Sequence, residues 1–275
     1  MSSRIRRLAV FASLAFVIGP LFFTTASAQP APGDLSGLWT RGPAAQSWYR
    51  PPESGPGPIA NLTPPPPDAA GGAGTIYVGD HLNPVLQPWA AEEVLRKANL
   101  AKAGTPEVGG QQVCRPHGVP FILGLNDAVQ ILHTPDHFIL MYAREMRTRI
   151  VYMNAPHPDP TTLRHSQYGH SVGHWEGDTL VVDTIGLSDD TWTDRLGTPH
   201  TESLRVVERY RKLSDTEVRV DFMVEDPGAF TIPWHAYVSY RPEEDNYTEQ
   251  VCAENNRDPI TGLEHPIPRD DTPDF

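Results

Sequence analysis

Residues 169–184 read Gly-His-Ser-Val-Gly-His-Trp-Glu-Gly-Asp-Thr-Leu-Val-Val-Asp-Thr, two β-rich runs that meet at Glu176-Gly177-Asp178. A glycine between two acidic residues at such a junction predicts a tight β-hairpin. For either two-residue loop, the even positions of the first strand share a face with the odd positions of the second. The reactive side chains of the hairpin then gather on one face, which has His170, Val172, His174, Val181 and Asp183.

Alternation of apolar and polar residues continues beyond the hairpin and predicts a series of strands. The predicted strands are 128–133, 137–143, 147–153, 168–175, 179–185, 203–211, 217–225 and 234–240. One helix is expected at 88–103, which begins with Pro88, has acidic residues early and basic residues late, and stops at Gly104. These elements predict a mainly β fold, an antiparallel lipocalin-like β-barrel, with a β-sandwich as the alternative.

The N-terminus has the layout of a secretory signal peptide. Three arginines between residues 4 and 7 precede an apolar run over 8–23, and Ala26-Ser27-Ala28 forms a small-residue cleavage pattern. The alternative is an uncleaved anchor, but the apolar run is shorter than the ~20 residues that a membrane span needs. We therefore predict a signal peptide over 1–28, cleavage after Ala28, and a periplasmic or secreted protein without stable membrane insertion.

Proline, glycine, alanine and serine dominate residues 29–75, which predicts an extended lead. Within it, residues 34–40 have the apolar content to dock as a short strand. Their glycine, two residues before tryptophan, resembles the opening of lipocalin-type barrels. We assign residues 76–252 to a single barrel domain, and residues 253–275, rich in proline and acidic residues, to an extended acidic tail.

The formal net charge of the chain is −12, and loss of the three signal-peptide arginines would take it to −15. Nucleic-acid binders concentrate positive charge in a patch or stripe, which this sequence lacks. We therefore expect a small-molecule or glycan partner and no nucleic acid.

The chain has two cysteines, Cys114 and Cys252. In an exported protein such a pair is usually oxidised, so we predict a disulfide between them. The alternatives are a pair of metal thiolates, or a nucleophilic cysteine with His117 as its base.

The hairpin histidines are the first candidates for chemistry. His170 and His174 cannot share one metal ion on an intact strand, because residues four apart lie about 13 Å from one another. His170 and Asp183 could instead form a histidine oriented by a carboxylate, half of a metal site, or a polar pair on a solvent-facing surface. We select His170 and Asp183 as catalytic and His174 as substrate-binding. The histidines without distinguishing spacing are His81, His117, His133, His137, His157, His165, His235 and His265.

In the predicted strand 203–211, Glu208 falls on the apolar face, where a carboxylate needs a partner. It suits acid–base chemistry or, alternatively, a structural ion pair with Arg149. Arg149 and Tyr152 are candidates to bind substrate, and Arg149 could hold a developing oxyanion. His200, in a predicted loop at the barrel rim, completes the catalytic set with Glu208.

Several motifs extend over most of the chain after the signal peptide. They are residues 34–39, Cys114-Arg-Pro-His-Gly-Val-Pro120, Arg149-Ile-Val-Tyr152, His157-Pro158, residues 169–184, Pro199-His200, Glu208-Arg209 and Glu225-Asp-Pro227. Together they resemble a large family of exported bacterial proteins that often occurs as many paralogues in one genome, a resemblance that implies no particular activity. In relatives an Asp-Gly-Arg turn follows the tyrosine, whereas Tyr152 precedes Met153-Asn-Ala-Pro156. This loop therefore offers no acid, which favours Glu208 and Asp183.

The leading hypothesis is an exported enzyme that performs cofactor-free acid–base elimination, isomerisation or hydrolysis of a small organic or carbohydrate-derived substrate in a barrel cavity. One alternative is a non-catalytic carrier whose barrel holds an apolar or glycan ligand. Another is a metal-dependent hydrolase or oxidase that uses His170, His200 and a carboxylate as ligands. The sequence has neither a glycine-rich phosphate loop nor a His-Glu-x-x-His zinc motif, and we expect no Gly-x-Ser-x-Gly nucleophile elbow.

Overall fold

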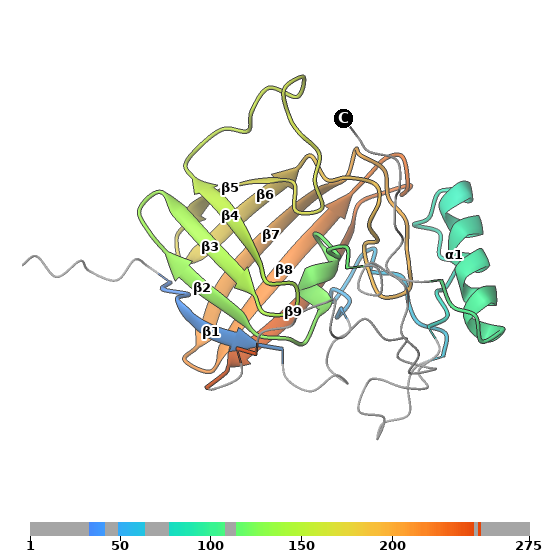
Figure 1. Cartoon of the computed structure of the whole chain (residues 1–275), viewed down its shortest axis with the longest axis horizontal. Helices are drawn as coiled ribbons and strands as arrows, with labels where there is room; N and C mark the ends of the chain where they lie inside the picture. Colours follow the sequence, from blue (N-terminus) through green and yellow to red (C-terminus); the bar gives the residue numbers. More distant parts are fainter. Residues whose placement is uncertain (1–32, 42–48, 64–76, 108–113, 245–246, 249–275) are drawn as a thin grey trace, which may run out of the picture. The chain divides into compact units, whose positions relative to one another are not determined.

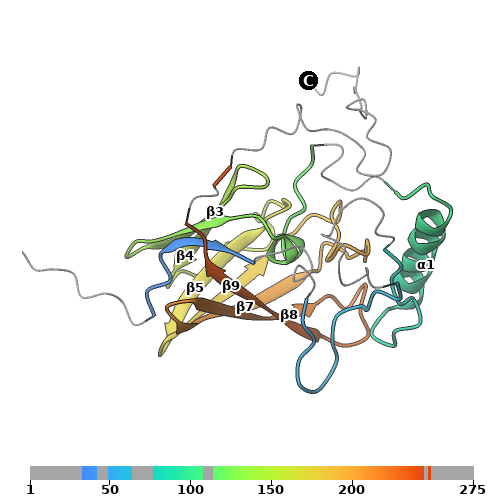
Figure 2. The ribbon, with the colours of Figure 1, turned by 90° about the horizontal axis from the view of Figure 1, so that it is seen from below.

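The computed structural model describes residues 33–41, 49–63, 77–107, 114–244 and 247–248. Nine strands form a closed barrel in chain order, and β1 pairs with β9 to close it (Figures 1 and 2). The predicted lipocalin-like barrel is therefore confirmed, and the sandwich alternative is excluded. The strands are β1 (Gly37–Thr40), β2 (Val129–His133), β3 (His137–Tyr142), β4 (Arg147–Met153), β5 (His170–Glu176), β6 (Thr179–Ile185), β7 (Arg205–Ser214), β8 (Glu217–Glu225) and β9 (Trp234–Pro242).

The predicted helix is α1 (Pro88–Lys102), which has proline in its first turn and Lys102 in its last turn. Its Trp89 indole donates a hydrogen bond to the Gly228 carbonyl at 2.7 Å, which holds α1 against the loop between β8 and β9. Among the described residues, no helix is long and apolar enough to cross a membrane. The predicted signal peptide lies outside the described residues.

The β5–β6 hairpin has the predicted geometry. Its register pairs Glu176 with Thr179, so the loop is Gly177-Asp178, and Gly177 has φ 64°, a conformation that glycine adopts without strain. Val172 pairs with Asp183 in the same register. The even positions of β5 and the odd positions of β6 therefore share a face, as predicted, and that face is the outer face of the barrel.

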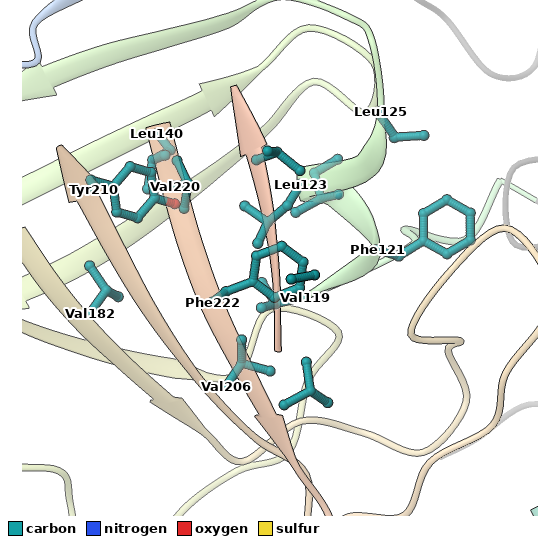
Figure 3. Close-up of a cluster of buried hydrophobic side chains, with 14 of the residues drawn as sticks. Val119, Phe121, Leu123, Leu125, Leu140, Val182, Val206, Tyr210, Val220 and Phe222 are labelled. Atoms are coloured by element: carbon teal, nitrogen blue, oxygen red, sulfur yellow. The ribbon is translucent and has the colours of Figure 1, made fainter. Parts of the chain in front are cut away.

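The interior of the barrel is filled by side chains. The most buried large residues include Trp234, Tyr210, Phe138, Leu140 and Leu180. Figure 3 shows strand residues such as Phe222 and Val206 in one cluster with Val119 and Leu123. Leu123 belongs to a 3-10 helix, η3 (Phe121–Gly124), which the sequence patterns did not predict and whose four residues are all buried.

Among the nine described strands, the pair of β4 with β5 is parallel and departs from the predicted antiparallel order. Residues 154–169 make the crossover, and their prolines at 156, 158 and 160 prevent this segment from continuing as a central strand. The two strands approach closely: a Cβ on Gly173 would lie 2.8 Å from Cγ1 of Val151. The crossover passes beside the start of β5, where it positions His157.

The barrel also begins earlier than the predicted domain boundary at residue 76. β1 comes from within the predicted lead, and its Trp39 is buried and pairs with Val129 of β2 and Pro242 of β9. The short apolar segment at 34–40 therefore supplies the strand that closes the barrel.

Candidate functional site

An ionic network occupies the interior of the barrel. Arg149 and Glu208 are 2% and 0% exposed. Nη1 of Arg149 donates to Oε1 of Glu208 at 2.9 Å, and Nη2 donates to Oε2. Nε and Nη2 of Arg149 also donate to the hydroxyls of Ser171 at 3.1 Å and Thr184 at 2.7 Å, and the Tyr210 hydroxyl donates to Glu208 at 2.8 Å.

This network favours the structural alternative for Arg149 and Glu208. Burial acts to lower the pKa of Arg149, but the Glu208 carboxylate outweighs it and raises that pKa well above its usual value. The guanidinium is thus fixed in its charged form, and all three of its nitrogens already donate hydrogen bonds within the protein. Neither residue presents a free polar group to a substrate.

Residues 169–173, Gly-His-Ser-Val-Gly, nevertheless match the letters of the Gly-x-Ser-x-Gly pattern of serine hydrolases. In those enzymes the serine lies on a sharp turn between a strand and a helix. Here Ser171 lies within β5, is 1% exposed, and bonds to Arg149 and Thr184. The fold therefore makes it a structural hydroxyl.

A second polar cluster lies on the outer face of the barrel. Nδ1 of His170 lies 3.0 Å from Nδ1 of His157, and Nε2 of His157 lies 3.8 Å from Oδ2 of Asp183. Arg205 donates two hydrogen bonds to Asp183, at 2.9 and 2.8 Å. The ring of Tyr152 stacks on that of His170 with their centroids 5.1 Å apart. We call His157, His170 and Asp183 the outer histidine chain.

The backbone geometry at the start of β5 positions the outer histidine chain. A Cβ on Gly169 would lie 2.4 Å from the carbonyl oxygen of Ile185, so only glycine fits where the crossover enters β5. The register places His170 opposite Ile185, and Asp183 lies opposite Val172, two residues further along β5. His157 approaches both side chains, and the predicted contact between His170 and Asp183 is indirect.

Burial lowers the pKa of both histidines of the chain. For His157, burial is opposed by the nearby Asp183 carboxylate and reinforced by Arg205; for His170, the neighbouring His157 adds to the effect of burial. Both rings are therefore largely neutral at neutral pH. One Nδ1 atom then donates the hydrogen bond between the rings and the other accepts it.

No spacing in the sequence singles out His157, because its partners lie 13 and 26 residues away. Its place in the His157-Pro158 motif was the only available signal. The structure also brings Tyr152, predicted to bind substrate, against His170.

The side chain of His174 is not part of the outer histidine chain. Its side chain is 54% exposed, and Nε2 lies 3.2 Å from Glu176, which in turn accepts a hydrogen bond from Arg209. It lies on the same outer face as His170, but no described residue stacks on its ring.

His200 lies in the loop before β7, where a loop was predicted, but its side chain is buried. Its Nδ1–H donates to the Thr201 carbonyl at 3.0 Å, and its Nε2 lies 2.8 Å from the Thr191 hydroxyl, which can donate to it. Burial lowers the pKa of His200. Both ring nitrogens are thus engaged within the protein, which suits a structural histidine.

A buried cluster near Cys114 was not predicted. Glu145 accepts hydrogen bonds from the backbone N–H of His117 at 2.7 Å and from the Tyr168 hydroxyl, and lies 2.5 Å from Nδ1 of His117. These contacts join residues more than twenty positions apart, so no local pattern could reveal them. Cys114 is disulfide-bonded; Cys252 lies outside the described residues, and the pairing stays a prediction.

Within the described ranges, no group of three or more His, Cys, Asp or Glu side chains could hold a metal ion. A pocket beneath η3, lined in part by Asp127, Tyr142, Arg144 and Tyr240, measures about 10 Å³, the space of one water molecule.

No known protein family matches the chain, and no curated protein matches it.

The inner ion pair gives a stability prediction. Arg149→Met leaves the Glu208 carboxylate buried without its partner, which should lower the free energy of unfolding by about 3–5 kcal/mol. Arg209→Met, which removes an exposed Arg–Glu pair, is the matched control and should cost much less. Urea unfolding measures both. An equal loss of unfolding free energy in the two variants would show that the Arg149–Glu208 pair stabilises the fold no more than a surface ion pair does.

His200 gives a pH prediction. Its lowered pKa means that the folded protein resists protonation, whereas the unfolded chain accepts a proton as the pH falls through about 6.5. The contribution of the buried, neutral His200 ring to the free energy of unfolding is therefore complete above that pH and is lost as the pH falls below it. We expect His200→Gln to reduce the loss of unfolding free energy between pH 7.5 and pH 5. Identical pH slopes in the variant and the parent protein would contradict this role.

Proposed function

We propose that the protein is an exported acid–base enzyme whose catalytic base is Nε2 of His170, on the outer face of the barrel. The observation that carries this proposal is the outer histidine chain, in which a carboxylate, a bridging imidazole and a second imidazole follow one another at 3.8 and 3.0 Å. Within the described residues, no hydrogen bond reaches Nε2 of His170.

The tautomers follow from the position of Asp183. Nε2 of His157 makes no hydrogen bond within the described residues, since Oδ2 of Asp183 lies 3.8 Å away. The nearby carboxylate favours a proton on this nitrogen, which leaves Nδ1 of His157 as an acceptor. His170 then donates from its Nδ1, and its Nε2 carries the lone pair. Arg205 donates two parallel hydrogen bonds to Asp183 and so fixes the carboxylate at one end of the outer histidine chain.

In the proposed reaction, Nε2 of His170 removes a proton from a substrate carbon or hydroxyl. The positive charge that develops on the ring is stabilised through His157 by the Asp183 carboxylate. The same proton is then returned to the leaving group or to another carbon, so the enzyme is regenerated without a cofactor. Elimination, isomerisation and hydrolysis of a small organic or carbohydrate-derived substrate all need this cycle.

The geometry favours this function over the alternatives. A carrier that holds its ligand inside the barrel needs a cavity, but side chains such as Phe138, Tyr210 and Trp234 fill the interior. A metal site that includes His200 needs a free ring nitrogen, and both of its nitrogens are hydrogen bonded within the protein.

The test compares two histidines on the same face of β5. His170→Ala should lower turnover by about 10²–10⁴-fold, the usual contribution of a positioned base, whereas His174→Ala should leave it unchanged. Because the pKa of His170 is lowered, the parent activity should persist below pH 6.5. The assay is NMR in D2O with a panel of β-hydroxy carbonyl compounds, uronic acids and glycosides. It follows both product formation and exchange of carbon-bound protons.

His157→Ala and Asp183→Asn should each lower turnover by a smaller factor, about 10–100-fold, because they act through His170. Full activity in His170→Ala, or equal losses in His170→Ala and His174→Ala, would overturn the assignment.

A further inference from the structure

The outer surface of the barrel is divided into a charged part and an uncharged part. The outward positions of β7 and β8 carry many charges, among them Arg205, Arg209, Arg211, Arg219, Asp221 and Glu225. The outward positions of β2, β3 and β4 carry no aspartate, glutamate, lysine or arginine; they are Gln130, Leu132, His137, Ile139, Met141, Thr148, Ile150 and Tyr152.

Four of these side chains form a continuous surface, which we call the apolar strip: Leu132, Ile139, Ile150 and Tyr152. Leu132 pairs with Ile139, and Ile139 pairs with Ile150, so the three aliphatic residues lie in one row across three strands. Leu132 and Ile150 are each 42% exposed and Tyr152 is 40% exposed. Barrel packing does not require large apolar residues at such positions.

The apolar strip is continuous with the outer histidine chain. Tyr152 follows Ile150 by two residues on β4, so the two side chains point to the same face. On its other side, the Tyr152 ring is stacked on His170 with an interplanar angle of 10°. Its edge is met by His137, whose ring centroid lies 5.5 Å away. Tyr152 therefore forms one wall of the proposed site and one end of the strip.

We infer that the apolar strip binds an uncharged hydrocarbon part of the substrate, an aryl or branched aliphatic group, whose polar reacting end lies at Nε2 of His170. This inference rests on the proposed function and adds the substrate class. The absence of charged side chains from the strip disfavours an ionic group there, because a charge would lose hydration without gaining a partner. A stacked aromatic ring and flat aliphatic side chains suit a planar or branched hydrocarbon.

The size of the strip also favours a small molecule. Four partly exposed side chains offer on the order of 200–300 Å², less than the roughly 300–600 Å² of the largest apolar patch on a typical monomer. A stable protein partner, including a second copy of this chain, buries roughly 800 Å² on each side. The strip is large enough to cover one face of a ring or a short branched chain.

The experiment uses 1-naphthol, a neutral aryl probe, and measures its binding to the mature protein by saturation-transfer NMR and by titration. Leu132→Thr and Ile150→Thr keep residues that favour strands, and together they should weaken binding by about tenfold. Leu213→Thr is the matched control, since Leu213 is 46% exposed on β7, away from the strip, and it should bind the probe as the parent protein does. Thermal unfolding confirms that all variants fold.

His170→Ala separates the two proposals, because the strip should bind 1-naphthol whether or not the base is present. Once a substrate is found, the strip variants should raise KM with little change in kcat, whereas His170→Ala lowers kcat. Unchanged probe binding in the double strip variant would overturn the substrate class alone. Light scattering gives the oligomeric state of both proteins. If the parent protein is a dimer and the double variant is a monomer, the substrate class is also overturned and the apolar strip is a self-association surface.

Discussion

The buried ion pair between Arg149 and Glu208 is the constraint on which the barrel wall depends. It joins β4 to β7, and the bonds of Arg149 to Ser171 and Thr184 include β5 and β6 in the same network. An ion pair in an apolar interior is stable only when its geometry is good and the remaining donors and acceptors are satisfied. Tyr210, on the same strand as Glu208, donates its hydroxyl hydrogen bond to the Glu208 carboxylate and so helps to satisfy its acceptors. Four neighbouring strands are therefore held in one register around a single guanidinium.

This network has a consequence for chemistry. The charged groups at the centre of the barrel, Arg149 and Glu208, bond to each other and to neighbouring hydroxyls, and mostly apolar side chains fill the rest of the interior. At the proposed site, His170, whose Nε2 makes no hydrogen bond within the described residues, lies on the outer face. The outer histidine chain fits this division: Asp183 is fixed by Arg205, which leaves the far nitrogen of His170 as the group that can act on another molecule. Stability and proposed chemistry thus use opposite faces of β5 and β6.

Much of the fold could be predicted from the sequence because strand alternation and one glycine carry the information. The alternation located eight strands to within a few residues, and Gly177 set the register of the central hairpin. The sequence could not show which face of that hairpin is inside, because each face mixes polar and apolar residues. Ser171 and Thr184 face inward, whereas Val172 and Val181 lie on the outer face.

The candidate site was only half predictable for a related reason. His170 and His174 have the same residue type, the same strand and the same face, yet only His170 is partly buried and held by an imidazole. The difference comes from the crossover between the parallel strands β4 and β5, which passes the start of β5 and brings His157 beside His170. The alternation of apolar residues and the spacing of histidines describe a single strand, whereas the reactivity of a histidine depends on the residues that pack beside it. The parallel pair, the least expected feature of the topology, is therefore also the feature that separates a candidate base from a surface histidine.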